Sequence, residues 1–152
     1  MEDRLLGRSA GAPDGSPAPP PPPDFELPGR VVVERRTDGG LEARARGVTL
    51  AVGRGAGTLR SVELLLAALG SCMLGTMLFF ADNAGVSLDG VSLELTPTLV
   101  DGPERVSRID MTMRIDGDVE PKRLASLRRV AEHCKVHSTL EHGPELKLAV
   151  ET

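Results

Sequence analysis

Apolar and polar side chains along the chain follow two periods, one typical of β-strands and one typical of helices. In residues 41–52, for example, Leu41 and Ala43 alternate with charged side chains, as in a strand with one buried face. The strands predicted in this way are residues 30–36, 41–52, 86–100, 105–117 and 145–151. The sequence TDGG (37–40) predicts a turn between the first two, and DGPE (101–104) predicts a long β-hairpin from the third and fourth.

The longest uncharged run of the sequence extends from Leu64 to Ala81, inside a helix predicted over residues 58–85 that Thr58 or Ser61 can cap. About 18 apolar residues are enough to cross a membrane. Glycine, serine and threonine within the run, and acidic residues close to both of its ends, favour a core helix of a soluble domain instead. A helix that is apolar on every face is buried on every face, so we expect a second subunit to cover part of it.

A second helix is predicted over residues 118–140, because Pro121 suits a first turn and apolar residues follow at helical spacing. These residues are Leu124, Leu127, Ala131 and Cys134. The order of strands, buried helix, strands, amphipathic helix and strand predicts an α+β domain over residues 31–152. Residues 1–30 are rich in proline, glycine and serine, which predicts a disordered tail.

The composition narrows the classes of function. The chain of 152 residues has no tryptophan, no tyrosine and three phenylalanines, so its core is small and aliphatic and gains from a partner surface, which predicts a homo-oligomer. A net charge of −4 without basic–aromatic clusters argues against nucleic acid as a partner. The first residues lack the apolar stretch of a secretory signal, so we expect the protein in the cytoplasm, where thiols stay reduced.

The two cysteines, Cys72 and Cys134, lie in the uncharged helix and at the end of the second helix. A buried cysteine is most often a small apolar filler. Cys134, however, is flanked by His133, Lys135 and His137, and nearby cations make a thiol more reactive. The same histidines are candidate zinc ligands, but the sequence has no CxxC pair and no second Cys/His pair at ligand spacing, so we expect no metal.

The segments SVELLLAALGSCM (61–73) and AEHCKVHSTLE (131–141), in this order and separation, resemble the OsmC/Ohr family of osmotically inducible and organic hydroperoxide resistance proteins. The resemblance covers about residues 31–152 and is that of a divergent member. It implies an intertwined homodimer, with antiparallel sheets packed around long central helices. It also implies a thiol peroxidase that reduces organic hydroperoxides in oxidative-stress defence, without metal or flavin, and that a dithiol such as a lipoylated protein regenerates.

The resemblance further implies roles for single residues. Cys72 matches the peroxidatic cysteine, which becomes a sulfenic acid when it attacks the peroxide, and Cys134 matches the resolving cysteine, which then forms a disulfide with it. Glu63 matches an acid that hydrogen-bonds a catalytic arginine, for which Arg36 is our choice. The turn that often carries this arginine reads TDGG here, which leaves as alternatives Arg35, Arg44 and Arg46.

Helical geometry adds one expectation about the site. Glu63 and Cys72 are nine residues apart, which is about 900° of helical rotation, so the two side chains point in opposite directions on one straight helix. If both serve one site, the partner chain supplies one of them. We expect the substrate pocket to be apolar and lined by side chains of the same helix such as Met73, Met77 and Phe79.

Two classes of function therefore stay open. The first is an enzyme, a cysteine-based peroxidase that acts on small organic hydroperoxides. The second is a non-catalytic dimer that binds a ligand or senses redox state, and that keeps the fold and the thiols without a positioned arginine. Attack on a peroxide requires a thiolate, so the ionisation of Cys72 at neutral pH separates the two.

Overall fold

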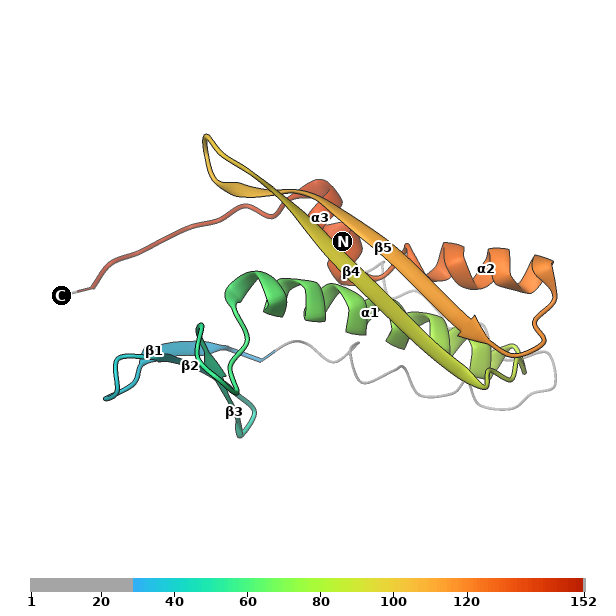
Figure 1. The fold of residues 1–152 in the computed structure, drawn as a ribbon, viewed down its shortest axis with the longest axis horizontal. Coiled ribbons are helices and arrows are strands. Elements are labelled where there is room, and N and C mark those ends of the chain that lie inside the picture. The colour runs from blue at the N-terminus through green and yellow to red at the C-terminus, as the bar shows by residue number, and fades with distance from the viewer. Residues whose placement is uncertain (1–28, 152) are drawn as a thin grey trace, which may run out of the picture.

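A computed structural model describes residues 29–151, in which a small sheet lies at one end of a long helix and a long hairpin crosses that helix (Figure 1). The sheet comprises the strands β1 to β3 and is called the N-terminal sheet below. The remaining elements, α1, the hairpin β4–β5, α2 and α3, are called the helical body. The tail predicted over residues 1–30 lies almost entirely outside the described residues.

The N-terminal sheet is antiparallel, in the order β1 (Val32–Arg35), β2 (Leu41–Ala45) and β3 (Val48–Val52). The single strand predicted over residues 41–52 is therefore wrong, because Arg46 and Gly47 form a tight turn in its middle. Both turn residues have a left-handed backbone, with φ of 49° and 78°. Turns of this kind match the right-handed twist of a hairpin, and glycine adopts them freely whereas arginine rarely does.

The long helix α1 (Ser61–Asn83) follows the loop after the N-terminal sheet, and Arg60 is its N-cap residue. Neither predicted cap is used, since the Thr58 hydroxyl donates to the Gly55 carbonyl and Ser61 is already helical. Instead, the backbone N–H of Arg60 donates to the Glu63 carboxylate over 2.8 Å. That carboxylate also suits the positive end of the helix dipole.

The hairpin of β4 (Gly90–Val100) and β5 (Arg105–Asp116) confirms the pairing expected from the sequence and crosses α1 (Figure 1). The helix and the hairpin approach closely at Gly70, which is buried. A methyl group at this position would stand 3.0 Å from the Cδ1 atom of Leu95 on β4. The absence of a side chain at Gly70 thus allows the hairpin β4–β5 to pack close to α1.

The single helix predicted over residues 118–140 is wrong, because the chain forms α2 (Pro121–Ala131) and α3 (Lys135–His142) instead. At the break, the N–H of His133 donates to the Val130 carbonyl, and Cys134 has an extended backbone with ψ of 157°. No glycine or proline stands at this break, and the helical spacing of apolar residues continues through it. The sequence therefore gives no signal that the helix is interrupted.

The core lies where one face of α1 meets α2, the start of α3 and the hairpin. Its buried residues are Leu69, Cys72, Met73, Met77, Ala81, Leu127, Ala131 and Cys134. Other positions of α1, such as Ala68, Ser71 and Leu78, are exposed within one chain, and the second subunit expected to cover part of this helix stays a prediction. Among the described helices, α1 is long and apolar enough to cross a membrane, a test that core helices of soluble proteins also pass.

The C-terminal segment departs from the sequence pattern as well. Residues 145–151 were expected to form a strand, and this is wrong in the described chain, where they are extended but paired with no other strand. Their alternating apolar side chains are largely exposed, and these are Leu146, Leu148 and Val150. The sequence of this segment therefore alternates as a strand does, but no neighbouring strand pairs with it within the described residues.

Candidate functional site

The fold brings the two cysteines together, although they are far apart in the sequence. Cys72 lies on the buried face of α1, with 8% of its surface exposed, and Cys134 lies at the start of α3, with 2% exposed. Both are free thiols, and a side-chain hydrogen bond links them. Two reduced sulfurs in contact inside a core can close to a disulfide and reopen.

The break between α2 and α3 has a direct consequence for Cys134. This residue caps α3, because its Sγ atom accepts a hydrogen bond from the backbone N–H of His137 over 3.4 Å. Burial raises the pKa of the Cys134 thiol to about 11, and the hydrogen bond from His137 opposes that shift. At neutral pH, Cys134 therefore keeps its proton.

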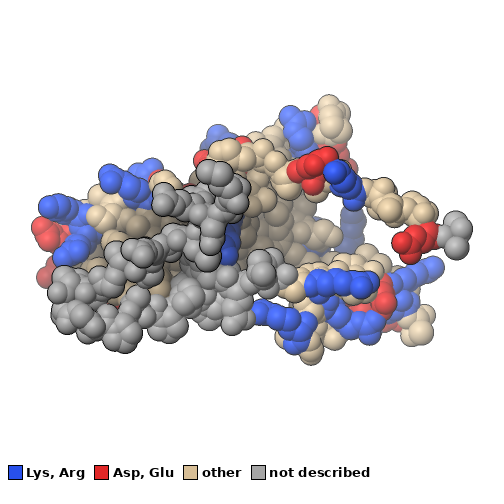
Figure 2. All heavy atoms as spheres, turned by 180° about the vertical axis from the view of Figure 1, so that it is seen from behind, with Lys and Arg blue, Asp and Glu red and all other residues tan. Residues whose placement is uncertain are grey.

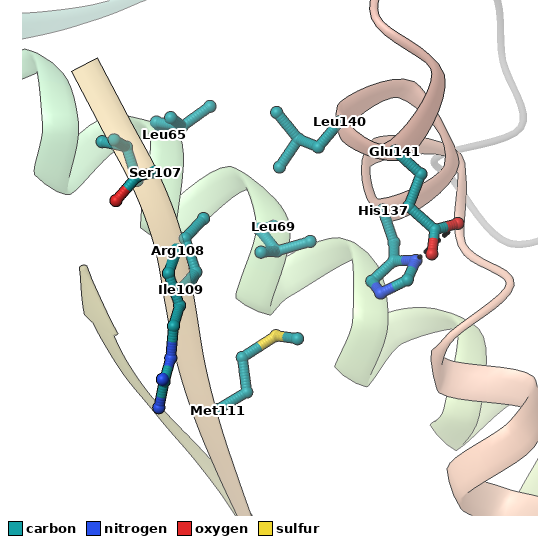
Figure 3. Close-up of a pocket in the computed structure, with 10 residues that line it drawn as sticks. Leu65, Leu69, Ser107, Arg108, Ile109, Met111, His137, Leu140 and Glu141 are labelled. Carbon is teal, nitrogen blue, oxygen red and sulfur yellow. Dashed lines mark ion pairs between the residues drawn. The ribbon is translucent and has the colours of Figure 1, made fainter. Parts of the chain in front are cut away.

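A cavity of about 300 Å³ lies between α1, β5 and α3, and its lining includes residues close in sequence to each cysteine (Figure 3). On α1 its wall is made by Leu65 and Leu69, and Leu69 precedes Cys72 by one helical turn, so they lie on the same side of the helix. On α3 its wall includes His137, which follows Cys134 by three residues. The other lining residues are Val106, Ser107, Arg108, Ile109, Met111, Leu140 and Glu141.

This lining differs from the one expected from the sequence. Met77 is completely buried in the core, and Met73 lines a second cavity of about 560 Å³ between β5 and α2. Phe79 lines neither of these cavities. The first cavity has largely apolar walls, which come from leucines one and two turns before Cys72 and from β5.

Within one chain, Glu63 and Arg36 lie away from the thiols. Glu63 is in the first turn of α1, and nine residues of helix place it about 14 Å along the axis from Cys72. Arg36 follows β1 and forms an ion pair with Asp38, with Nη2 2.6 Å from Oδ2. The roles expected for these two residues, and for the alternative arginines, stay predictions.

The histidines near Cys134 do not gather into a metal site. Between residues 29 and 151 no three or more histidine, cysteine, aspartate or glutamate side chains form a group that could hold a metal ion. The rings of His133 and His142 are hydrogen-bonded to the backbone carbonyls of Arg129 and Ser138. His137 differs from both, because its ring faces the cavity beside Glu141 (Figure 3).

The pairing of His137 with Glu141 was missed at the level of sequence. The atoms Nδ1 of His137 and Oε2 of Glu141 are 3.4 Å apart. Histidine and glutamate at positions i and i+4 of one helix face each other, so the spacing in the segment CKVHSTLEH carried this signal. A single helix over residues 118–140 would end before Glu141 and would not pair this residue with His137.

Comparison with known proteins agrees with this fold. The profile of the family described as OsmC-like protein matches residues 54–149. No curated protein matches the sequence. An OsmC-like protein from Mycoplasma pneumoniae has a similar structure, with a TM-score of 0.70 and 16% identity over 78% of this chain and 91% of that one.

Two further solved structures are similar to the chain. One is an organic hydroperoxide resistance protein, OsmC, from Legionella pneumophila, with a TM-score of 0.59 and 17% identity over 76% of this chain and 90% of that one. The other is the organic hydroperoxide resistance protein OhrB of Bacillus subtilis, with a TM-score of 0.58 and 15% identity over 77% and 93%. At these identities the likeness concerns the fold.

Proposed function

Because the chain belongs to the OsmC-like family, we propose that it is a cysteine-based thiol peroxidase, which reduces organic hydroperoxides in the cytoplasm as part of oxidative-stress defence. The contact between the buried thiols of Cys72 and Cys134 carries this proposal. A dithiol that closes to a disulfide is what a two-cysteine peroxidase cycle requires. The adjoining cavity, with its leucine, isoleucine and methionine walls, suits the apolar part of an organic hydroperoxide.

In the proposed reaction, the Cys72 thiolate attacks the outer oxygen of the peroxide, the O–O bond breaks, and the other oxygen leaves as an alcohol after taking a proton. Cys72 is then a sulfenic acid. The Cys134 sulfur attacks the Cys72 sulfur, the S–O bond breaks, and water leaves as the disulfide forms. A dithiol reductant, such as a lipoylated protein, returns both cysteines to thiols and becomes a disulfide itself.

We also propose that the protein acts as a homodimer in which a second copy covers the exposed faces of α1. Charge favours this arrangement. Residues 30–54, which include the N-terminal sheet, contain six arginines and three acidic residues, and their net charge is +3. Residues 55–151 contain ten basic and fourteen acidic residues, and their net charge is −4. Basic side chains gather over the N-terminal sheet (Figure 2, lower right), and complementary charge favours contact between this sheet and the helical body of a partner.

The dimer supplies what one chain lacks at its thiols. In this proposal the partner provides Glu63. The ion pair between Arg36 and Asp38 breaks, and Arg36 then binds the Glu63 carboxylate and the peroxide. A mixed dimer of Cys72→Ser chains and Glu63→Gln chains tests the arrangement. We expect peroxidase activity to return in the mixture, because one site then combines an intact Cys72 with an intact Glu63. A mixture as inactive as either parent dimer would contradict it.

The peroxidase proposal itself is tested by counting thiols. Reduced protein receives one equivalent of cumene hydroperoxide per chain, and free thiols and remaining peroxide are followed in time. We expect two thiols to disappear per peroxide consumed. Cys72→Ser removes the reaction, and Cys134→Ser stops it at a sulfenic acid that dimedone traps. Oxidation no faster than that of a free thiol would overturn the proposal.

One observation favours the alternative, a non-catalytic dimer that binds a ligand or senses redox state. Arg36 is paired with Asp38 and lies in a different region from the thiols, so one chain does not present Arg36 to Cys72. Under this alternative, cumene hydroperoxide oxidises Cys72 slowly, and apolar ligands occupy the cavity without turnover. Binding of a fluorescent apolar probe together with slow oxidation would favour it over the enzyme.

A further inference from the structure

The resolving step poses a chemical difficulty that the proposed function leaves open. A thiol attacks sulfur as its thiolate, yet Cys134 lies buried with 2% of its surface exposed. With its pKa raised to about 11, only about one thiol in 10⁴ is ionised at neutral pH. Formation of the disulfide therefore needs a base close to the Cys134 sulfur.

His137 is the side chain best placed to be that base. Its backbone N–H is bonded to the Sγ atom of Cys134, so the residue is fixed beside this sulfur. Its side chain is 17% exposed and lines the cavity opposite Leu65 and Leu69. Figure 3 shows the ring extending from α3 towards α1, with one nitrogen facing Glu141 and the other facing away from it.

Glu141 gives the ring a defined orientation. Nδ1 of His137 lies 3.4 Å from the Glu141 carboxylate, is buried, and makes no hydrogen bond in this conformation. A carboxylate at this distance favours a proton on Nδ1, which leaves Nε2 as the free acceptor of the neutral ring. This is the tautomer that a general base requires.

The other groups around the ring do not offer the same chemistry. Of the ionisable residues that line the cavity, the third is Arg108 on β5, which is exposed and bonded to Asp110 over 2.8 Å through Nε. An arginine does not release its proton in the relevant range of pH. On the side of α1, the cavity is lined by leucines alone.

We propose that His137 is the acid–base residue of the disulfide step and that Glu141 is its positioning residue; this rests on the peroxidase cycle proposed above. Directly or through one water in the cavity, Nε2 takes the proton of Cys134 while that sulfur attacks the Cys72 sulfenic acid. The S–O bond breaks, and the imidazolium returns the proton to the departing hydroxide, which leaves as water. One thiol and one sulfenic acid become one disulfide and one water, with no further reactant.

The first test needs no peroxide. Reduced protein is labelled on Cys72 with a substoichiometric amount of dithiobis(nitrobenzoate), which releases a first thionitrobenzoate. Attack of Cys134 on the labelled Cys72 then releases the second one, and this step is followed by absorbance. Cys134→Ser retains the label and so identifies the second step. We expect His137→Gln to slow release about a hundredfold, in line with the usual size of general base catalysis. His142→Gln, a histidine of the same helix bonded to the Ser138 carbonyl, is the matched control and should release at the wild-type rate.

The pH profile separates a base from a structural role. In the wild type a base removes the proton of Cys134, so the rate should depend on pH less steeply than the thiolate fraction of Cys134 does. In His137→Gln it should rise about tenfold per pH unit up to about pH 11, because it then depends on the thiolate fraction of Cys134. Glu141→Gln should lower the rate about tenfold, because the ring then loses the carboxylate that orients it.

The proposal is overturned if His137→Gln releases the label at the wild-type rate, or releases it slowly with the wild-type pH profile. Should His137→Gln fold poorly by circular dichroism, His137→Ala with added imidazole replaces it, and no recovery of rate on adding imidazole would equally count against the base. With cumene hydroperoxide, His137→Gln should accumulate the Cys72 sulfenic acid. If peroxide oxidises the wild type slowly but release of the label depends on His137, the peroxidase proposal is rejected and the role of His137 as a base is retained.

Discussion

The helical body and the N-terminal sheet differ in where their stability comes from. The body has a continuous core, in which Met77 and Leu127 are completely buried. In the N-terminal sheet, Val52 is the one buried residue of the three strands. Most of the large apolar side chains of the sheet are exposed, with 59% of Val33 and 67% of Val48 accessible. A three-stranded sheet needs a packed hydrophobic face to be stable, and the sheet does not find one within the described chain.

This difference teaches how the site is divided. The thiols, the cavity and the His137–Glu141 pair all belong to the body, whose geometry one chain determines. Arg36, the arginine chosen from the sequence, belongs to the sheet, whose covering surface must come from elsewhere. Under the proposed homodimer, chemistry that depends on the sheet requires association, and chemistry that depends on the body does not.

The largest effect is expected in the core of the body. Leu127→Ala removes a completely buried side chain and should lower the free energy of unfolding by about 2–5 kcal/mol. Leu124→Ala is the matched control on the same helix, because Leu124 is 37% exposed and should cost about 1 kcal/mol or less. Urea denaturation measures both. Equal losses for the two variants would show that α2 does not pack as the structure has it.

The second prediction concerns the sheet and its dependence on a partner. Hydrogen exchange in β1 to β3 should accelerate on dilution, because the monomer leaves their apolar side chains uncovered, whereas exchange in the buried part of α1 should change little. Mass spectrometry of peptides from each region, at concentrations that span the monomer–dimer transition found by sedimentation, measures this. Protection of the sheet that is independent of concentration would break the proposed link to association.

The sequence predicted the body better than the sheet, for a physical reason. Long elements were found, because α1 contains a long uncharged run and each strand of the hairpin β4–β5 repeats one alternation over eleven or more residues. Short breaks were missed. Gly47 alone marks the turn between β2 and β3, since Arg46 is an unusual residue there, and no glycine or proline marks the break before Cys134.

The candidate site divides in the same way. Cys72 and Cys134 were selected from motifs, and the fold brings them into contact, which no local pattern could show. The His137–Glu141 pair was missed because its meaning depends on α3 being a separate helix that Cys134 caps. The strand expected over residues 145–151 has the right alternation, but a strand also needs a neighbour, and sequence pattern alone does not say which one.

A smaller effect is expected from pH, and it should be confined to the body. The folded protein holds the Cys134 proton up to about pH 11, whereas the thiol has an ordinary pKa of 9.0 when unfolded. Between these values the folded state binds more protons, so stability should be complete below about pH 9 and should fall as pH rises towards 11. Urea midpoints under reducing conditions measure this. Cys134→Ala should lose that part of the decline, and an identical decline in the variant would refute the assignment.

The smallest effect is expected in the turn of the sheet, where Arg46 has a φ of 49°. Asparagine tolerates this left-handed backbone and precedes glycine in the preferred two-residue hairpin turn, so Arg46→Asn should stabilise the hairpin β2–β3 by roughly 0.5–1 kcal/mol. Gly47→Ala is the opposing control, because Gly47 has a φ of 78° and alanine would add strain. Hydrogen exchange of the sheet and of the body reports the two regions separately. If the body in Arg46→Asn gains as much protection as the sheet, the two regions unfold as one unit and differ only in how they are covered. If the sheet alone gains, they unfold independently, and a stabilised sheet should then strengthen the proposed dimer without changing the thiol chemistry of the body.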